Sequence, residues 1–187
     1  VGEMAPGLSI LNQLGDMGVT IVAKGDSPGL QRFDRVVSDH QVGGYEITRF
    51  FLDRGCKRIA RFSQPLPDQY WKQTRRLGYE RAMREAGLEP LPEVPVEEQL
   101  YVGEITKAQF DKTVRRVTGW LVPHLIGPNP LEAILLDTDF VHFYVAAACR
   151  RCGLEPGRDS RSGGYDNYWK ECKPRQWEPS VPAATVD

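Results

Sequence analysis

The sequence has few cysteines and no long apolar run. Its four cysteines among 187 residues are too few and too scattered for a disulfide-stapled scaffold; they are Cys56, Cys149, Cys152 and Cys172. No stretch approaches the roughly 20 apolar residues that a membrane-spanning helix needs. The first residues, VGEMAPGLS, lack the basic and apolar regions of a secretory signal peptide. From these absences we expect a protein of the reducing cytoplasm with no membrane partner.

The sequence also lacks an excess of charge of one sign and any grouping of histidines. Lys and Arg number 24 and Asp and Glu number 25, so the net charge of -1 gives no general reason to expect nucleic-acid binding by this segment. None of His40, His124 and His142 has a carboxylate or cysteine at metal or triad spacing. Gly163-Gly164 precedes Tyr-Asp and not a helix with Lys-Ser or Lys-Thr, so it is no phosphate loop. The sequence predicts no catalytic residue, no metal site and no cofactor.

The strongest folding signal lies between Val36 and Phe62. Arg35-Val36-Val37 is a short run typical of a strand, and Asp39 is a helix start signal. Residues Tyr45–Arg54 place apolar side chains on one helical face, and Arg58–Phe62 then alternates like a strand. Strand, helix and strand joined by short loops predict one βαβ unit, and therefore an α/β fold with a parallel sheet.

The rest of the chain alternates in the same way. Helices are predicted at 6–18, 70–87, 105–125 and 140–152. Strands are predicted at 19–23, 99–102, 133–136, 162–165 and 184–186, and a proline-rich connector at 88–95. The buried face of the helix at 70–87 is expected to include Leu77, Tyr79, Ala82 and Met83. The helix at 105–125 is expected to carry an apolar stripe of Phe110, Val114, Val117 and Leu121. A chain of 187 residues is long enough to form one domain, or two small ones, around a real core.

Seven segments carry a resemblance to a known family. Gly18-Val19-Thr20-Ile21-Val22 resembles "GIPVV", Val37-Ser38-Asp39 with Gly43-Gly44 resembles "VxxDNxxGG", and residues 51–60 resemble "HLIELGHRRIA". Residues 74–79 resemble "RxxGF", 133–139 "AIFCANDxxA", 164–167 "GYDN" and 183–186 "LTTV". By the order and spacing of these segments, the chain resembles the effector-binding core of the lac repressor and galactose repressor family of transcriptional regulators.

The resemblance implies a fold and a division of the chain. The fold would be the parallel-sheet, type I periplasmic-binding-protein-like fold, present as most of the second subdomain and part of the first. Residues 1–38 would belong to the N-terminal subdomain, 39–170 would form the C-terminal subdomain, and 171–187 would begin the return crossover to the N-terminal subdomain. Because the family's helix-turn-helix and its first βα units have no counterpart here, and no initiator Met is present, we expect a cut or processed piece of a longer protein.

The resemblance also implies a function. The parent protein would be a regulator that binds a small-molecule effector, a sugar or a related compound, in a cleft between its two subdomains. It would contact DNA only through an N-terminal module that this chain lacks, and it would be a homodimer.

Candidate ligand contacts follow from residue chemistry and the resemblance together. Sugar hydroxyls need polar forks, and the apolar faces of a sugar ring need an aromatic surface. Arg75 offers five donors and Asp166 two acceptor oxygens, and the resemblance implies that both face the cleft. One of Tyr70 and Trp71 is expected to stack on the ligand. The resemblance adds three residues to the predicted ligand-binding set, namely Thr138, Asp139 and Asn167.

Other interpretations stay open at this point. Without the resemblance, Arg75 would be part of a solvated helix face and Asp166 a turn former. A periplasmic sugar-binding transport protein of the same fold would share the predicted site. Cys149-Arg150-Arg151-Cys152 has the spacing of a thiol-disulfide pair, although such pairs are favoured at the start of a helix and this one lies at the end of a predicted helix.

Overall fold

The structure, a computed structural model, describes residues 6–25, 27–65, 69–100, 104–168 and 173–186. It contains a two-stranded sheet, β1-β2, and a five-stranded sheet with the strand order β4-β3-β5-β6-β7. Every strand pair is parallel. The predicted class, an α/β fold with a parallel sheet, is therefore confirmed.

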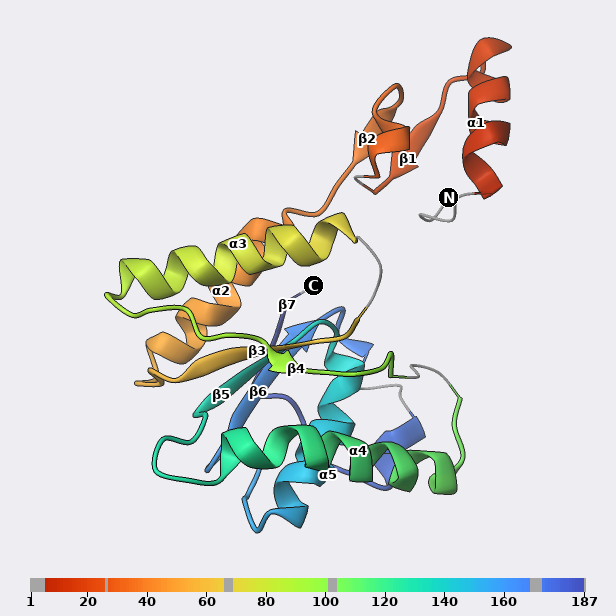
Figure 1. Ribbon diagram of the computed structural model, residues 1–187. Helices are drawn as coiled ribbons and strands as arrows, with labels where there is room; N and C mark the ends of the chain where they lie inside the picture. Colours follow the sequence, from red (N-terminus) through yellow and green to blue (C-terminus); the bar gives the residue numbers. More distant parts are fainter. Residues whose placement is uncertain (1–5, 26, 66–68, 101–103, 169–172, 187) are drawn as a thin grey trace.

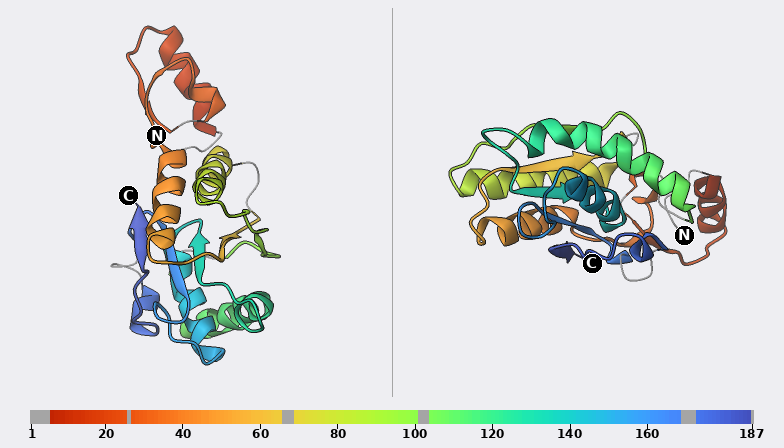
Figure 2. Two further views of the ribbon diagram at one scale, coloured as in Figure 1. Left: turned by 90° about the vertical axis from the view of Figure 1, so that its left-hand side faces the viewer. Right: turned by 90° about the horizontal axis from the view of Figure 1, so that it is seen from below.

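The two sheets belong to two units of different size, which Figures 1 and 2 show at opposite ends of the molecule. We call residues 6–36 the N-terminal unit and residues 40–186 the sheet unit. The N-terminal unit consists of α1 (Pro6–Asp16), β1 (Val22–Lys24), the 3-10 helix η1 (Pro28–Leu30) and β2 (Asp34–Val36). Its small buried cluster is formed by Leu11, Ala23 and Leu30.

The sheet unit alternates strands and helices along the chain. Its first half comprises α2 (His40–Leu52), β3 (Ile59–Ser63), α3 (Tyr70–Glu85), β4 (Val94–Pro95) and α4 (Lys107–Leu125). Its second half comprises β5 (Ala133–Leu136), the 3-10 helix η2 (Asp139–Val141), α5 (His142–Arg151), β6 (Arg161–Tyr165), the 3-10 helix η4 (Lys173–Gln176) and β7 (Ala184–Val186). The helices α2 and α3 cover one face of the five-stranded sheet, and α4 and α5 cover the other (Figure 1).

The hydrophobic core is split in two by this sheet. Side chains of α2 and α3, including Phe51 and Met83, pack with Ile59 of β3 in one cluster. Side chains of α4 and α5, including Leu121 and Phe143, form the other cluster. All residues of β3 and β5 are buried, as expected for central parallel strands that are covered on both faces.

Local signals account for the helix ends. The Asp39 side chain accepts a hydrogen bond from the Val42 amide at 2.9 Å, so it caps α2 as predicted. Thr106 and Gln109 form a capping box at the start of α4. The helix α4 continues through Pro123 to Leu125, and its predicted apolar stripe from Phe110 to Leu121 is buried.

The predicted βαβ unit at 36–62 was wrong. Its first strand, β2, pairs only with β1, while its last strand, β3, lies in the five-stranded sheet. The helix α2 therefore connects two sheets and does not cross over within one. All three residues of β2 are exposed. The strand β3 also does not alternate, because helices cover both of its faces.

Three smaller expectations also differ from the structure. The connector at 88–95 contains β4, because buried Val94 pairs with Phe62. Leu77, expected in the buried face of α3, is 46% exposed. Of the strand predicted at 99–102, residues 99 and 100 lie outside any strand and 101 and 102 lie outside the described residues. The division at residues 38 and 170 stays a prediction, although β7 at 184–186 pairs with β6 and so belongs to the five-stranded sheet.

Candidate functional site

The candidate site lies at the carboxyl edge of the five-stranded sheet. There β3 ends at Ser63, β5 is followed directly by Asp137, and β6 is followed directly by Asp166. Because the strands are parallel, these ends meet at one edge, which is where ligands bind in open α/β sheets. Arg75, from the second turn of α3, reaches the same edge.

Arg75 is the most constrained side chain at this edge. It is 8% exposed, and its Nη1 donates to the main-chain oxygen of Asp137 at 2.7 Å. Its guanidinium carbon lies 3.7 Å from the ring centre of Tyr165 and 4.5 Å from that of Trp71, which are cation–π distances. Burial lowers the pKa of Arg75, and Tyr165 and Asp166 oppose that shift. Its Nε is buried and has no hydrogen-bond partner within the described part of the chain, so one donor of the fork is free.

Asp166 faces Arg75 across the edge, with its Oδ1 4.0 Å from Arg75 Nη2. The structure therefore brings together the two residues that were predicted as the main anchors. The Asp166 side chain is 36% exposed, so the carboxylate is partly open to solvent. Asp166 and Asn167 have φ angles of 85° and 56°, a left-handed conformation that Asp and Asn adopt more readily than other residues with a Cβ, although with more backbone strain than glycine. Strain of this kind is found at binding sites whose surroundings hold the loop in place.

The other predicted contacts take different positions. Trp71 packs against Arg75, whereas Tyr70 is 51% exposed and lines a separate pocket of about 390 Å³ beside residues 37–41. Thr138 precedes η2 in an extended conformation. Asp139 is fully buried and accepts hydrogen bonds from the Tyr168 amide at 3.1 Å and from the Thr185 hydroxyl at 3.4 Å. These bonds tie the 166–168 loop to β7. Ligand contact by any of the predicted residues stays a prediction.

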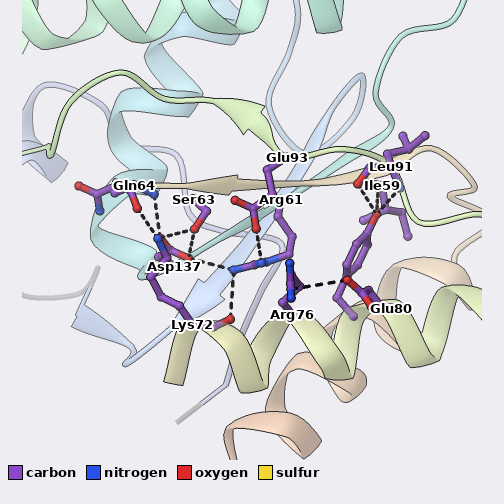
Figure 3. A network of polar contacts seen from close by, with 11 residues as sticks. Ile59, Arg61, Ser63, Gln64, Lys72, Arg76, Glu80, Leu91, Glu93 and Asp137 are labelled. Carbon is purple, nitrogen blue, oxygen red and sulfur yellow. Dashed lines mark hydrogen bonds and ion pairs between the residues drawn. The ribbon is translucent and has the colours of Figure 1, made fainter. Parts of the chain in front are cut away.

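Sequence reasoning missed Asp137, which is 4% exposed and lies at the centre of a polar network (Figure 3). Its carboxylate accepts from the Ser63 hydroxyl at 3.0 Å and from the Gln64 amide at 2.8 Å, and lies 3.5 Å from Arg61 Nη2. Burial raises the pKa of Asp137, and Arg61 is the largest opposing influence. A usable signal was present, because an acid that directly follows a buried parallel strand lies at the carboxyl edge.

Arg61 extends this network to the outside of the molecule. Its guanidinium pairs with Glu93, which lies directly before β4, and also approaches the main-chain oxygen of Lys72 at 3.5 Å. The Lys72 ammonium in turn donates to the main-chain oxygen of Gln64. Figure 3 shows these side chains converging from β3, β5 and the start of α3.

The cysteine pair does not form part of this site. Cys149 and Cys152 are free thiols near the end of α5, on the side of the sheet opposite α3. Burial raises the pKa of Cys149 to about 12, so this thiol is not activated for exchange. In the described ranges, no three His, Cys, Asp or Glu side chains are grouped so that they could hold a metal ion. No helix there is long and apolar enough to cross a membrane.

A parallel sheet covered by helices on both faces, with a buried arginine and a partly exposed carboxylate at its carboxyl edge, has polar groups where ligands bind in open α/β sheets. The chain belongs to the periplasmic binding protein-like domain family, whose profile matches residues 48–174. The predicted resemblance to the effector-binding domain of the lac repressor type is thereby confirmed.

Known proteins similar to this chain include several regulators. The HTH-type transcriptional regulator RegA of Clostridium saccharobutylicum is 26% identical over 164 residues, which cover 86% of this chain and 44% of that protein. The crystal structure of a LacI-family regulatory protein from Chloroflexus aggregans has a TM-score of 0.63 at 22% identity and covers 98% of this chain and 69% of its own. A complex of the transcriptional regulator CelR with cellobiose has a TM-score of 0.61 at 21% identity, and the match covers 95% of this chain and 58% of the CelR chain. The chain thus spans less than half the length of its curated relative.

Proposed function

We propose that this chain is the ligand-sensing part of a transcriptional regulator and that it binds a small sugar or a related polyol at the carboxyl edge of its five-stranded sheet. The observation that carries the proposal is the Arg75–Asp166 pair. A guanidinium that is 8% exposed and lies 4.0 Å from a partly exposed carboxylate places donors and acceptors side by side. Adjacent hydroxyls of a sugar need this combination.

The surroundings of the pair favour a sugar over a purely apolar ligand. Trp71 offers an aromatic ring next to Arg75, and apolar faces of sugar rings pack on such surfaces. The strained backbone at Asp166 and Asn167 fixes the carboxylate before a ligand arrives. An edge built from charged groups is hydrated when it is empty, so the ligand displaces water and replaces its hydrogen bonds.

The regulatory part of the proposal rests on the relatives. The similar protein from Clostridium saccharobutylicum is an HTH-type regulator, and a similar solved structure holds cellobiose. With a net charge of -1, this chain is not expected to bind DNA itself, so DNA contact would come from another part of a longer polypeptide. Ligand-driven closure of two subdomains in a cytoplasmic homodimer would transmit the signal. A transport protein of the same fold would use the same edge, and the regulator among the relatives favours sensing.

Calorimetric titration tests the proposal. The complete natural polypeptide that contains residues 1–187 is titrated with cellobiose, maltose, glucose and ribose, and so are its Arg75→Ala and Asp166→Ala variants. Each variant should lose about ten- to a hundred-fold in affinity, because a ligand hydroxyl is left without its partner at roughly 1–3 kcal/mol.

Glu132→Gln is the matched control for these variants. The Glu132 carboxylate accepts hydrogen bonds from two backbone amides, and Glu132 lies at the amino end of β5, away from the candidate site. This variant should bind as the wild type does. Unchanged sugar affinity in both Arg75→Ala and Asp166→Ala, with the fold intact, would refute the proposal.

A further inference from the structure

Two buried arginines meet at a single acidic residue beneath the candidate site. Arg61 is 5% exposed and Arg75 is 8% exposed, and each carries a guanidinium group. Arg61 Nη2 lies 3.5 Å from the Asp137 carboxylate, and Arg75 Nη1 donates to the Asp137 main-chain oxygen at 2.7 Å. Asp137 therefore contacts both cations through different atoms.

The charges of this network balance. Among the described residues it joins three cations, Arg61, Lys72 and Arg75, to three anions, Glu93, Asp137 and Asp166. Asp137 is the most deeply buried of the three acids, at 4% exposure of its side chain against 42% for Glu93 and 36% for Asp166. A charge in low dielectric acts most strongly on its neighbours, so Asp137 sets the local potential more than the outer acids do.

We propose that Asp137 is a specificity-determining residue that makes this edge select a neutral ligand and reject its phosphorylated form. The proposal rests on the function proposed above and adds the charge class of the ligand and the residue that sets it. It needs no contact between Asp137 and the ligand.

Two features of Asp137 produce the selection. Its carboxylate accepts hydrogen bonds from Ser63 and from the Gln64 amide and lies 3.5 Å from Arg61 Nη2, and these three groups hold it in place and favour its ionised form against burial, which raises its pKa. Its main-chain oxygen holds Arg75 so that the guanidinium donates to a ligand hydroxyl while its charge is already matched by Asp137 and Asp166. A phosphate at this edge would gain little from Arg75 and would be repelled by both carboxylates.

The substitution Asp137→Asn tests the proposal, because the amide keeps the size of the side chain and an acceptor oxygen for Ser63 or Gln64 but removes the charge. Wild type and variant are titrated with two matched pairs, glucose with glucose 6-phosphate and ribose with ribose 5-phosphate, and separately with inorganic phosphate. The wild type should prefer the neutral member of a pair and leave inorganic phosphate unbound at millimolar concentration. The variant should shift the preference toward the phosphorylated member by about tenfold or more and should acquire phosphate binding.

Two further variants separate charge from packing. Arg61→Gln/Asp137→Asn removes one charge of each sign, so it should return the preference to the neutral sugar and lose the acquired phosphate binding. Glu132→Gln changes a charge at the amino end of β5, the strand that Asp137 follows, and it should change neither the preference for the neutral sugar nor the binding of inorganic phosphate. A merely structural role of Asp137 would lower all affinities together and would not reverse their order.

A variant in the opposite direction covers the case in which Asp137→Asn does not fold. Arg61→Gln leaves an excess of negative charge, and it should favour glucosamine over glucose relative to the wild type by about tenfold. Tighter binding of a sugar phosphate than of its sugar by the wild type, an unshifted order in Asp137→Asn, or an unshifted glucosamine preference in Arg61→Gln would each overturn the proposal. If the wild type binds no sugar, the proposed function fails, and the inorganic phosphate titrations still decide the role of Asp137.

Discussion

The N-terminal unit and the sheet unit are built from the same kinds of element but bury them very differently. In the sheet unit the helices cover both faces of five strands, and the two resulting clusters contain its largest fully buried side chains. In the N-terminal unit two strands of three residues pair with each other, and among its described residues the buried cluster consists of Leu11, Ala23 and Leu30. Val22, the first residue of β1, and Val36, the last residue of β2, are each 63% exposed.

The difference shows where the stability of the chain resides. An isolated two-stranded sheet is marginal in water, and apolar strand faces are normally covered. The sheet unit satisfies both requirements with its own residues, and it also holds Arg75, Asp137 and Asp166. We therefore expect the sheet unit to dominate unfolding and the N-terminal unit to open separately.

The largest expected effect compares the two cores directly. Phe51→Ala removes a fully buried ring between α2 and the sheet, and should lower the free energy of unfolding by about 3–5 kcal/mol. Leu30→Ala in the N-terminal unit should leave the main urea transition in place and speed proteolysis within residues 6–36. Urea unfolding and limited proteolysis measure the two effects. An equal loss in the main transition from Leu30→Ala would mean that the units unfold as one.

The next prediction is a pH dependence that belongs to the sheet unit. His142 is 1% exposed with Nδ1 2.6 Å from the Ser162 hydroxyl, and burial lowers the pKa of His142 to about 4 while nearby Glu178 raises it. Because the unfolded chain takes up this proton near pH 6.5 and the folded chain resists it, stability is present above pH 6.5 and falls between pH 6.5 and 4 by about 3 kcal/mol. His142→Gln should flatten this part of a urea-midpoint-against-pH curve. An unchanged slope would mean that other groups titrate there.

A smaller effect is expected where α2 crosses α3. A Cβ added at Gly78 would lie 2.1 Å from the Gln41 main-chain oxygen and 2.6 Å from the Tyr45 amide nitrogen, so Gly78→Ala must push the helices apart. The cost should be about 1–3 kcal/mol, with weaker ligand binding because Arg75 lies one turn away in α3. Gly119→Ala in α4 is the matched control, since nothing lies within 4 Å of its added Cβ, and it should stabilise slightly. A lower thermal unfolding midpoint for Gly119→Ala than for Gly78→Ala would contradict the close crossing of α2 and α3.

The smallest effect is expected at the junction of the two units. Asp39→Ala removes the cap of α2 and should cost about 1 kcal/mol. Asp39→Asn keeps a capping oxygen and should stay close to the wild type. Differential scanning calorimetry of both variants measures the cap, and an equal loss in both would assign the effect to the charge of Asp39.

The sequence predicted elements well where the local pattern matched the final environment. The strands at 133–136 and 184–186 and the apolar stripe of α4 were of this kind, because their side chains are buried by neighbours that the α/β pattern also implies. It predicted the strand at β2 but not its pairing with β1, and it missed β4, because a run of three or two residues does not reveal which strand it pairs with. Pairing depends on contacts between distant parts of the chain.

The candidate site shows the same division. Residue chemistry and the resemblance predicted that Arg75 and Asp166 both face the ligand site, and the structure places the two side chains 4.0 Å apart. The burial of Asp139 was not visible, because it results from contacts with Tyr168 and Thr185 across the loop and β7. The position of Asp137 directly after the predicted strand at 133–136 would have placed it at the carboxyl edge, but its partners could not be predicted because they come from β3, the residue after it and α3, far away in the sequence.

Amide hydrogen exchange with and without the sugar that binds most tightly tests the central claim, a ligand site at the carboxyl edge of the five-stranded sheet. Bound sugar should slow exchange at 63–65, 70–76, 137–140 and 165–168, and leave the amino ends of the same strands, including residues 57–59 and 131–133, unchanged. Slowed exchange confined to other parts of the sheet unit, with none at these four segments, would contradict the assignment of the site.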